Sequence, residues 1–331
     1  MSQLFPTVYS TLDPAALAAW FGDRYGHPDV KCDVFVRGVG DTYILQTDDT
    51  RFVLRVYRPS HRNLAQISAE LALLLAAKDA GVSVSFPVAD PTGEVIHGFE
   101  AAEGIRYGVV FSYAPGAFVS VLNEAQLRNL GRELARFHDV ASAVRLGDSR
   151  WTYDPETTLT KPLEKVRPYF ALLPEEYAWW RQAAERAIAR VAQTDTSGFS
   201  SGYCHFDLLP QNFHFDGDSP TLFDFDFAGY GWLVYDLAIF RVHLDLDVHF
   251  GRQTKEAADA GFTTFLSAYM EQRPLSDDEQ ALIPWLGLSF WCFYMGFHST
   301  HDQFYPLVQP GQLKARTALI RKLTEAVWRV D

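Results

Sequence analysis

Polar residues whose spacing suits chemistry gather in one otherwise apolar stretch, residues 201–227. His205 and Asp207 are separated by one residue, Asn212 follows five residues after the aspartate, and Asp224 lies further on within a run of phenylalanines. Aspartate and asparagine are poor strand formers and are costly to bury without partners. Average residue usage would produce the pattern H-x-D-x-x-x-x-N in a chain of this length only about once or twice in a hundred. The stretch therefore indicates a polar site.

These residue types are the ones that phosphoryl transfer requires. The reaction needs a carboxylate that orients a hydroxyl and a metal site built from hard oxygen ligands, because Mg²⁺ bridges the transferring phosphates. Asp207 would hold the hydroxyl and take its proton, while Asn212 and Asp224 would bind Mg²⁺. Asp226 is a candidate ligand of a second metal ion, or instead a hydrogen-bonding partner of nearby backbone or of His205.

The same stretch resembles the aminoglycoside phosphotransferase and choline kinase superfamily, whose catalytic motif is H-G-D-x-x-x-x-N followed by a strand bearing I-D. Residues 223–238, which begin F-D-F-D and end Y-D-L-A, are similar to that family's D-F-[DE]…Y-D-L-A segment. Through residues 51–59 the chain looks most like stress-response kinases and bacterial homoserine kinases. The resemblance implies an α+β, bilobal protein-kinase-like fold, with a small antiparallel β lobe containing one helix and a larger, mostly helical lobe.

The resemblance also implies cofactors and residue roles. ATP and Mg²⁺ would be the cofactors, with Asp207 as the catalytic aspartate and Asn212 and Asp224 as metal ligands. Glu70 matches the helix glutamate that pairs with a strand cation. His205 belongs to the catalytic motif, and we interpret it as a donor that braces the loop, since Asp207 already stands where the hydroxyl proton should go. The aspartate of the Y-D-L-A segment is interpreted as structural.

Three positions depart from the family pattern. Arg55 stands where the family has its nucleotide-binding lysine, and it offers a positive fork for the phosphates without being equivalent to lysine. Phe206 replaces the glycine after the histidine, which would narrow the loop or reposition the substrate. The loop over residues 37–43 contains Gly38 and Gly40 without a full glycine-rich signature, so it predicts either a phosphate-covering loop or a tight turn between strands.

Turn residues and periodicity divide the chain near residues 112–117. The first part predicts helices over residues 15–21 and 64–80, and strands over residues 34–36, 43–46, 51–57, 84–88, 94–97 and 106–113. The second part predicts helices over residues 127–140 and 177–192 and a buried helix pair over residues 281–297, apart from the β-rich stretch 201–227. We expect a nucleotide-binding lobe over residues 1–113 and a catalytic and substrate-binding helical lobe over residues 114–331. Ser112 and Tyr113 would meet the base through backbone groups.

The composition of the chain limits the classes of partner and the cellular compartment that we expect. The net charge of −12 argues against a nucleic-acid partner, which would need clustered lysine and arginine. The longest uncharged stretch, residues 281–297, is too short and too interrupted to span a membrane. The three cysteines lie far apart in no metal-binding or disulfide pattern, which favours a reducing cytoplasm. The first ten residues contain no basic region followed by an apolar run, so we expect no secretory signal.

The residues after the Y-D-L-A segment should shape the acceptor pocket. Arg241 would suit the carboxylate of an amino-acid alcohol such as homoserine. Aromatic rings combined with acids would suit an amine or a quaternary ammonium group, although core packing also accounts for rings in helices. The other residues considered are His243, Asp245, Asp247, Trp285, Trp291, Phe293, Tyr294 and Phe304. The expected partner is therefore a small molecule bearing a hydroxyl, with cationic compounds among the candidates.

Histidines outside the motif carry weaker signals. His138 lies on the apolar face of a helix and is interpreted as a core histidine with satisfied hydrogen bonds. His298, His301 and Asp302 form a loose cluster with a metal-like look, and ordinary exposed polar residues after a buried helix are the alternative reading.

Three functions compete at this point. The first is a small-molecule O-phosphotransferase, and the second is a protein Ser/Thr kinase of the stress-response type. The third is a nucleotide-binding pseudokinase that acts as a regulator, for which Arg55 and Phe206 are the only grounds. A P-loop kinase is excluded because G-x-x-x-x-G-K-[ST] is absent, and the lack of G-x-S-x-G argues against a serine hydrolase. The sequence does not indicate the acceptor, the oligomeric state or a preference for ATP over GTP.

Overall fold

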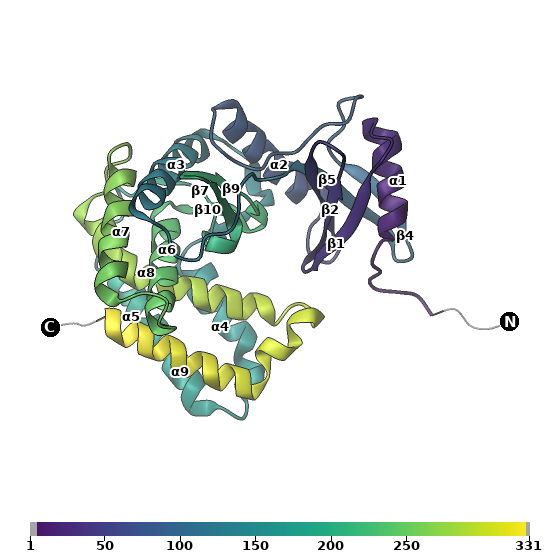
Figure 1. Cartoon of the computed structure of the whole chain (residues 1–331). Helices are drawn as coiled ribbons and strands as arrows, with labels where there is room; N and C mark the ends of the chain where they lie inside the picture. The colour runs from purple at the N-terminus through teal and green to yellow at the C-terminus, as the bar shows by residue number, and fades with distance from the viewer. Residues whose placement is uncertain (1–4, 329–331) are drawn as a thin grey trace. The chain divides into compact units, whose positions relative to one another are not determined.

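The computed structural model describes residues 5–328 and divides into two compact units (Figure 1). The boundary lies between Pro115 and Gly116. Gly116 has φ 78°, and a side chain there would collide with the backbone of Phe215, to which Ala117 is joined by two backbone hydrogen bonds of 2.9 and 3.1 Å. Glycine is required at this entry to the second unit because both its conformation and its surroundings exclude a Cβ atom.

Over the described residues, the first unit is an antiparallel sheet of five strands with two helices, and the antiparallel sheet is the one that the sequence predicts (Figure 1). The strand order is β1-β2-β3-β5-β4. Apolar side chains of the first helix pack against strands β2, β3 and β5 and form the core of this unit. The elements are α1 (Pro14–Tyr25), β1 (Lys31–Arg37), β2 (Gly40–Gln46), β3 (Arg51–Tyr57), α2 (Leu64–Asp79), β4 (His97–Ala101) and β5 (Gly104–Ser112).

Two predicted strands of this unit are wrong. Residues 84–88 join β5 through a single bridge at Pro87, because proline has no N–H with which to continue a ladder. Residues 94–96 follow the turn at 91–93 without regular structure, and β4 begins only at His97. The Asp90 carboxylate organises that turn by accepting hydrogen bonds from the backbone N–H groups of Thr92 and Glu94 at 2.8 and 3.0 Å.

The second unit is mostly helical and contains a three-stranded sheet and a two-stranded hairpin (Figure 1). In the three-stranded sheet, β10 lies between β6, which is parallel to it, and β7, which is antiparallel. The helices are α3 (Glu124–Ala143), α4 (Lys161–Val166), α5 (Pro174–Ala192), α6 (Val234–His249), α7 (Lys255–Met270), α8 (Asp277–His298) and α9 (Pro310–Val327). The strands are β6 (Trp151–Tyr153), β7 (Ser201–Cys204), β8 (Phe213–Asp216), β9 (Ser219–Leu222) and β10 (Gly229–Trp232). The α+β prediction is confirmed.

The predicted helix pair over residues 281–297 is wrong, because α8 is one continuous helix. Pro284 lies within it, past the first turn, and the helix continues through this position although proline removes one backbone hydrogen bond. Gly287 and Gly296 act as packing positions: a Cβ atom on Gly287 would lie 2.8 Å from Val242, and one on Gly296 would lie 2.7 Å from Pro162. Both glycines therefore allow α8 to approach α6 and α4 closely, and neither ends the helix.

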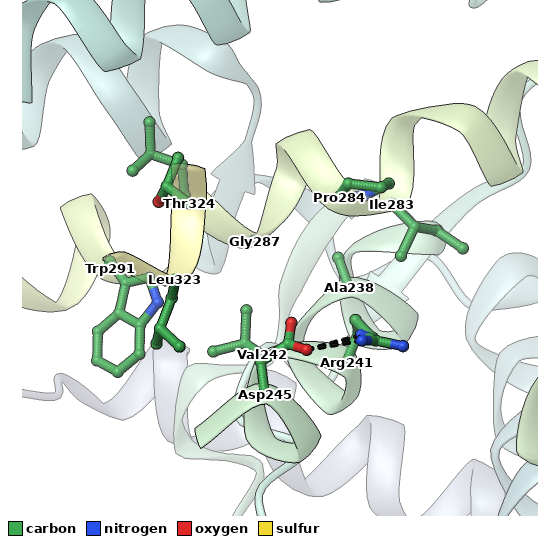
Figure 2. A pocket seen from close by; sticks show the side chains of 11 residues that line it. Ala238, Arg241, Val242, Asp245, Ile283, Pro284, Gly287, Trp291, Leu323 and Thr324 are labelled. Atoms are coloured by element: carbon green, nitrogen blue, oxygen red, sulfur yellow. Dashed lines mark hydrogen bonds and ion pairs between the residues drawn. The ribbon is translucent and has the colours of Figure 1, made fainter. Parts of the chain in front are cut away.

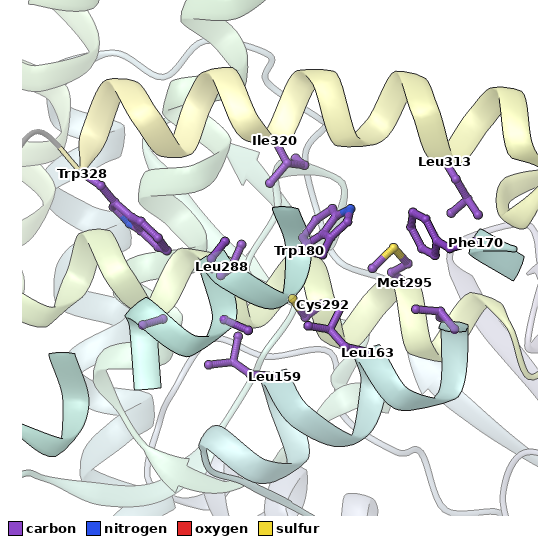
Figure 3. Close-up of a cluster of buried hydrophobic side chains, with 14 residues drawn as sticks. Leu159, Leu163, Phe170, Trp180, Leu288, Cys292, Met295, Leu313, Ile320 and Trp328 are labelled. Atoms are coloured by element: carbon purple, nitrogen blue, oxygen red, sulfur yellow. The ribbon is translucent and has the colours of Figure 1, made fainter. Parts of the chain in front are cut away.

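A large apolar cluster holds α4, α5, α8 and α9 together (Figure 3). Figure 3 shows the Trp180 ring near its centre, below Ile320 of α9 and beside Met295 of α8. The Trp180 side chain is fully buried, and its indole N–H donates a 2.9 Å hydrogen bond to the Thr317 hydroxyl. Within residues 5–328, each helix falls short of the length and apolarity needed to cross a membrane.

Replacing Trp180 with alanine should destabilise the second unit by about 3–5 kcal/mol, because it removes a fully buried indole ring from the cluster and leaves a cavity. Chemical denaturation followed by circular dichroism would measure the loss. Thr317→Val is the matched control, since it keeps the volume of the side chain, removes the acceptor for Trp180 and the donor to the Leu313 carbonyl, and should cost about 1–3 kcal/mol. Equal stability of Trp180→Ala and the unaltered chain would contradict this account of the cluster.

Candidate active site

The residues of the motif lie together at the end of strand β7. Asp207 follows the strand directly, and Asn212 ends the short helical turn η4 (Pro210–Asn212). The Asn212 side-chain amide donates to the backbone oxygen of Asp207 at 2.8 Å and to its Oδ2 atom at 2.7 Å. Both side chains are buried, at 8% and 4% exposed. Because the amide nitrogen faces Asp207, the Asn212 amide oxygen points the other way.

Asp224 is held beside this loop through its neighbour Phe223. The Phe223 N–H donates to the Asn212 carbonyl at 2.9 Å, and the Phe223 carbonyl lies 3.0 Å from Nε2 of His205. Asp224 itself has a left-handed backbone, with φ 61° and ψ 62°, and precedes the short turn η5 (Phe225–Phe227). Its side chain is exposed. The structure thus brings His205, Asn212 and Asp224 to one place.

Asp226 is fully buried within η5. Its backbone carbonyl accepts a hydrogen bond from the guanidinium of Arg150, which also donates to the carbonyls of Phe225 at 3.1 Å and Ala228 at 2.8 Å. Arg150 therefore fixes the turn that follows Asp224. A metal-binding role for Asp226 stays a prediction.

The carboxylate of Asp236, on α6, fixes the other side of the catalytic loop. It accepts the backbone N–H groups of His205 and Phe206, each at 2.7 Å, and lies 2.9 Å from Nε2 of His138. The other ring nitrogen of His138 lies 2.8 Å from the hydroxyl of Tyr269. All these groups are buried. Both ring nitrogens of His138 have partners, so its interpretation as a core histidine is confirmed, and Asp236 has the structural contacts that the sequence suggested.

Phe206, which replaces the family's glycine, adopts the conformation that favours glycine. Its φ is 60°, which is costly for a residue with a side chain. The ring is fully buried and stacks on Tyr153 with centroids 3.6 Å apart, while Phe293 meets it edge-on at 5.1 Å. This aromatic packing offsets the backbone strain, so the loop keeps its shape without the glycine.

Burial and like charge raise the pKa of Asp207 to about 7. Loss of solvent is the larger cause, and repulsion by Asp224 is the second. Burial also lowers the pKa of His205 and of His138. A neutral His138 donates from Nε2 to Asp236 and accepts at Nδ1 from Tyr269. In His205, Nε2 is directed at the Phe223 carbonyl and Nδ1 at the Asp207 N–H, which favours bracing over proton transfer.

The side-chain oxygen atoms near Asp207 suit a hard divalent cation that takes its remaining ligands from water and substrate. Within residues 5–328, no group of three or more histidine, cysteine, aspartate or glutamate side chains is arranged to hold a metal ion, and this includes the cluster around His298. Mg²⁺ is usually held by one or two carboxylates together with waters and substrate phosphates. The Asp224 carboxylate and the outward amide oxygen of Asn212 fit that requirement.

In the first unit, the predicted phosphate loop lies next to Arg55. The Gly38 N–H donates to the Gly40 carbonyl at 2.9 Å, which closes a tight turn between β1 and β2. A Cβ atom on Gly40 would lie 3.7 Å from Nε of Arg55 and 3.1 Å from the Val56 carbonyl. Glycine at position 40 therefore lets the loop lie directly on β3. The predicted loop and the predicted phosphate-binding cation are neighbours.

The remaining predicted nucleotide-site residues occupy separate elements of the same unit. Glu70 lies on α2 and is buried. The Ser112 N–H donates to the Phe86 carbonyl at 2.9 Å, and its own carbonyl accepts from the Ser85 hydroxyl at 2.5 Å. Tyr113 packs under the guanidinium of Arg51, 4.1 Å from its ring centroid. Because Ser112 uses its backbone groups within the unit, Tyr113 is the better candidate for contact with a base.

Arg241, the predicted partner of a substrate carboxylate, is already matched by two acids. Its guanidinium contacts Asp245 and Asp259, each at 2.7 Å, and Figure 2 shows the first of these pairs at the edge of a cavity between α6, α8 and α9. The cavity offers about 30 Å³ to water-sized molecules. Because Arg241 is already paired with two carboxylates, a substrate carboxylate would have to displace one of them, and a role of Arg241 in binding a substrate stays a prediction.

A comparison with models of protein families identifies the family of this chain. The model of the phosphotransferase enzyme family, abbreviated APH, matches residues 34–273, which cover a large part of each unit and every residue of the motif. The chain belongs to this family. It is an enzyme, a phosphotransferase with an alcohol group as acceptor, and the family resemblance and the kinase-like fold predicted from the sequence are confirmed.

Known relatives of this phosphotransferase extend over most of its length. An uncharacterized protein of Deinococcus radiodurans is 34% identical over 88% of this chain and 84% of its own. The amicoumacin kinase of Bacillus subtilis is 25% identical over 84% of this chain and 83% of its own. A homoserine kinase of Polaromonas naphthalenivorans is 27% identical over 80% of this chain and 82% of its own.

Solved structures show the same fold. An amicoumacin kinase in complex with AMP-PNP, Ca²⁺ and Ami superposes with a TM-score of 0.72 and 20% identity, over 97% of this chain and 96% of that one. A microcompartment-associated aminopropanol kinase gives a TM-score of 0.72 and 19% identity, over 95% of this chain and 97% of that one. At these identities the match supports the fold of the phosphotransferase.

Several residues of the site carried no recognisable sequence signal. Arg150 reaches the turn after Asp224 from about 75 positions away in the chain. Tyr153 supports Phe206 by stacking, again from a distant segment. Tyr294 was expected only as one ring among several in a pocket, yet it interacts with Asp207. The local signal for such a partner was Phe206 itself, because it stands where the family has glycine and its ring needs packing.

Replacing Asp236 with asparagine should lower turnover by about 100-fold, because an amide cannot accept all three hydrogen bonds and the loop would shift. Phosphotransfer assays with the variant and the unaltered chain would measure the loss.

Asp247→Asn is a matched control for this variant. Asp247 is also a buried carboxylate on α6, eleven residues after Asp236, and it pairs with Arg252 at 2.5 Å and His243 at 3.2 Å, neither of them in the catalytic loop. Its replacement should cost stability and leave turnover unchanged. If both variants lost turnover to the same extent, general damage to α6 would replace the bracing role of Asp236.

Proposed function

We propose that this phosphotransferase uses ATP and Mg²⁺ to phosphorylate the hydroxyl group of a small amino alcohol. The proposal rests on one observation, the environment of the two carboxylate oxygens of Asp207. Asn212 holds Oδ2 of Asp207, while within residues 5–328 the other carboxylate oxygen, Oδ1, is buried and makes no hydrogen bond of ordinary geometry. A buried carboxylate oxygen without a donor is unfavourable unless a ligand supplies one. The hydroxyl of an acceptor is such a donor.

Asp207 would act on the acceptor in two ways. Its Oδ1 atom accepts the hydroxyl hydrogen, which fixes the direction of the acceptor oxygen, and it takes the proton as the new bond to phosphorus forms. Its raised pKa suits that transfer, because the carboxylate is a stronger base than an exposed aspartate. His205 and Asp236 hold the loop still while this happens.

Asn212 and Asp224 would hold Mg²⁺ through the amide oxygen and the carboxylate. The bound ion supplies positive charge to the β- and γ-phosphates. In the first unit, we assign Arg55 and the loop of Gly38 and Gly40 to the phosphates, and Tyr113 to the base. Glu70 would support this part of the site from α2.

The acceptor class rests on the chemistry of the relatives' named substrates. Homoserine and aminopropanol each carry an amine and a hydroxyl, and they are the substrates in the names of a relative and of a structural neighbour. The net charge of −12 favours a cationic acceptor over an anionic one. Arg241, the cation expected for a substrate carboxylate, is already paired with Asp245 and Asp259, so we place aminopropanol-like compounds ahead of homoserine.

The test is transfer of labelled phosphate from ATP, with Mg²⁺, to a panel of 1-amino-2-propanol, ethanolamine, choline, L-homoserine, an aminoglycoside and casein. We expect label on an amino alcohol, and Asp207→Asn should lower the rate by about 100-fold or more. Binding of ATP by the variant, measured by calorimetry, is the control for folding. Label on casein alone would replace the proposal with a protein kinase, and full activity of Asp207→Asn would remove Asp207 from the mechanism.

Replacing Asp224 with alanine should weaken binding of ATP in the presence of Mg²⁺ by about tenfold or more, which is about 1.4 kcal/mol. Binding of ATP without the metal ion should change little, because the lost carboxylate acts through Mg²⁺. Isothermal titration calorimetry with and without Mg²⁺ measures these two ATP affinities separately. Asp216→Ala removes an exposed carboxylate at the end of β8 and serves as the control. An unchanged dependence on Mg²⁺ would exclude Asp224 as a ligand.

A further inference from the structure

A second buried polar atom lies beside Asp207 and has no assigned role. The hydroxyl oxygen of Tyr294, on α8, is shielded from solvent although part of the ring is exposed. Within residues 5–328 it makes no hydrogen bond of ordinary geometry, which is also true of Oδ1 of Asp207. The two groups are nevertheless close enough to interact. The Asp207 charge and burial together raise the pKa of Tyr294 well above its usual range, so the phenol keeps its proton.

The Tyr294 ring is held in place from two sides. The Phe227 ring, from the turn after Asp224, lies 5.0 Å from it, and the Phe290 ring, one turn earlier on α8, lies 4.7 Å from it. A ring fixed in this way presents its hydroxyl at a constant position. The Tyr294 hydroxyl and the Asp207 carboxylate interact as donor and acceptor, yet their contact lacks ordinary hydrogen-bond geometry. A polar group that binds between them would complete the hydrogen bonds of both.

An alcohol fits between these two groups. Its oxygen has one hydrogen and two lone pairs, so it can donate to Asp207, accept from Tyr294 and keep one lone pair for the phosphorus atom. We propose that the Tyr294 hydroxyl binds the acceptor oxygen beside Asp207, and that these two side chains together orient the alcohol for phosphoryl transfer. This inference rests on the proposed function, since it names the second contact of the same acceptor hydroxyl.

The transfer balances without any further group. The acceptor oxygen forms a bond to the γ-phosphorus of ATP, and the bond between that phosphorus and the bridging oxygen of the leaving ADP breaks. The acceptor proton passes to Oδ1 of Asp207. Tyr294 donates its hydrogen bond throughout and keeps its proton, so its contribution is to hold the acceptor oxygen in line with the bond that breaks.

The test is a double-mutant cycle with Tyr294→Phe, Asp207→Asn and the double variant. Tyr294→Phe removes one oxygen and keeps the ring in its aromatic surroundings. The acceptors are 1-amino-2-propanol, L-homoserine and water, the last measured as phosphate released from ATP. We expect kcat/KM for the alcohol to fall by about 10- to 100-fold in Tyr294→Phe, with KM for ATP unchanged. In the Asp207→Asn background, Tyr294→Phe should lower kcat/KM for the alcohol by less than about threefold, because the acceptor is already misplaced.

Tyr177→Phe is the control, since Tyr177 lies on α5 and donates to the Leu163 carbonyl at 3.3 Å, within the apolar cluster of that unit. It should leave kcat/KM for each acceptor unchanged. Unchanged kcat/KM in Tyr294→Phe, or losses that add fully in the double variant, would overturn the role of Tyr294 while the proposed function stands. If the unaltered enzyme transferred phosphate to none of the three acceptors, the proposed function and this inference would fail together.

Discussion

The buried carboxylate of Asp236 is the constraint on which the catalytic loop depends. A buried negative charge is stable only when hydrogen-bond donors surround it, and here the donors are two consecutive backbone N–H groups of the loop and the ring of His138. The loop cannot move without leaving that charge unsatisfied. One side chain of α6 thereby joins the loop to α3 and, through Tyr269, to α7.

This arrangement makes ionisation of Asp207 costly. Burial is the larger cause, and repulsion by Asp224 adds to it. Arg150, which contacts the turn after Asp224, donates to the backbone carbonyls of Phe225 and Ala228. A divalent cation bound beside Asp224 would therefore favour the ionised form of Asp207.

The sequence predicted the parts of the site whose partners lie close along the chain. Five-residue spacing places Asn212 against Asp207, and the structure shows that contact, while the catalytic and metal-binding roles stay predictions. Residues that act through distant partners were missed, as with Arg150 and Tyr153. Tyr294 was expected in the acceptor pocket, but without its contact with Asp207. Gly287 and Gly296 predicted a break because glycine weakens an isolated helix, but Val242 and Pro162, which make glycine necessary there, lie outside any local window.

Phe206 and Tyr153 show how one substitution in a loop can make two distant positions depend on each other in evolution. A left-handed backbone at residue 206 costs a non-glycine residue about 1–3 kcal/mol, and the stacked Tyr153 ring offsets it. A chain with glycine at 206 has no such need for an aromatic ring at 153. Among related chains, the two positions should therefore change together, and the order of change matters: the ring at 153 can precede the loss of glycine without harm, whereas the reverse order passes through a strained loop.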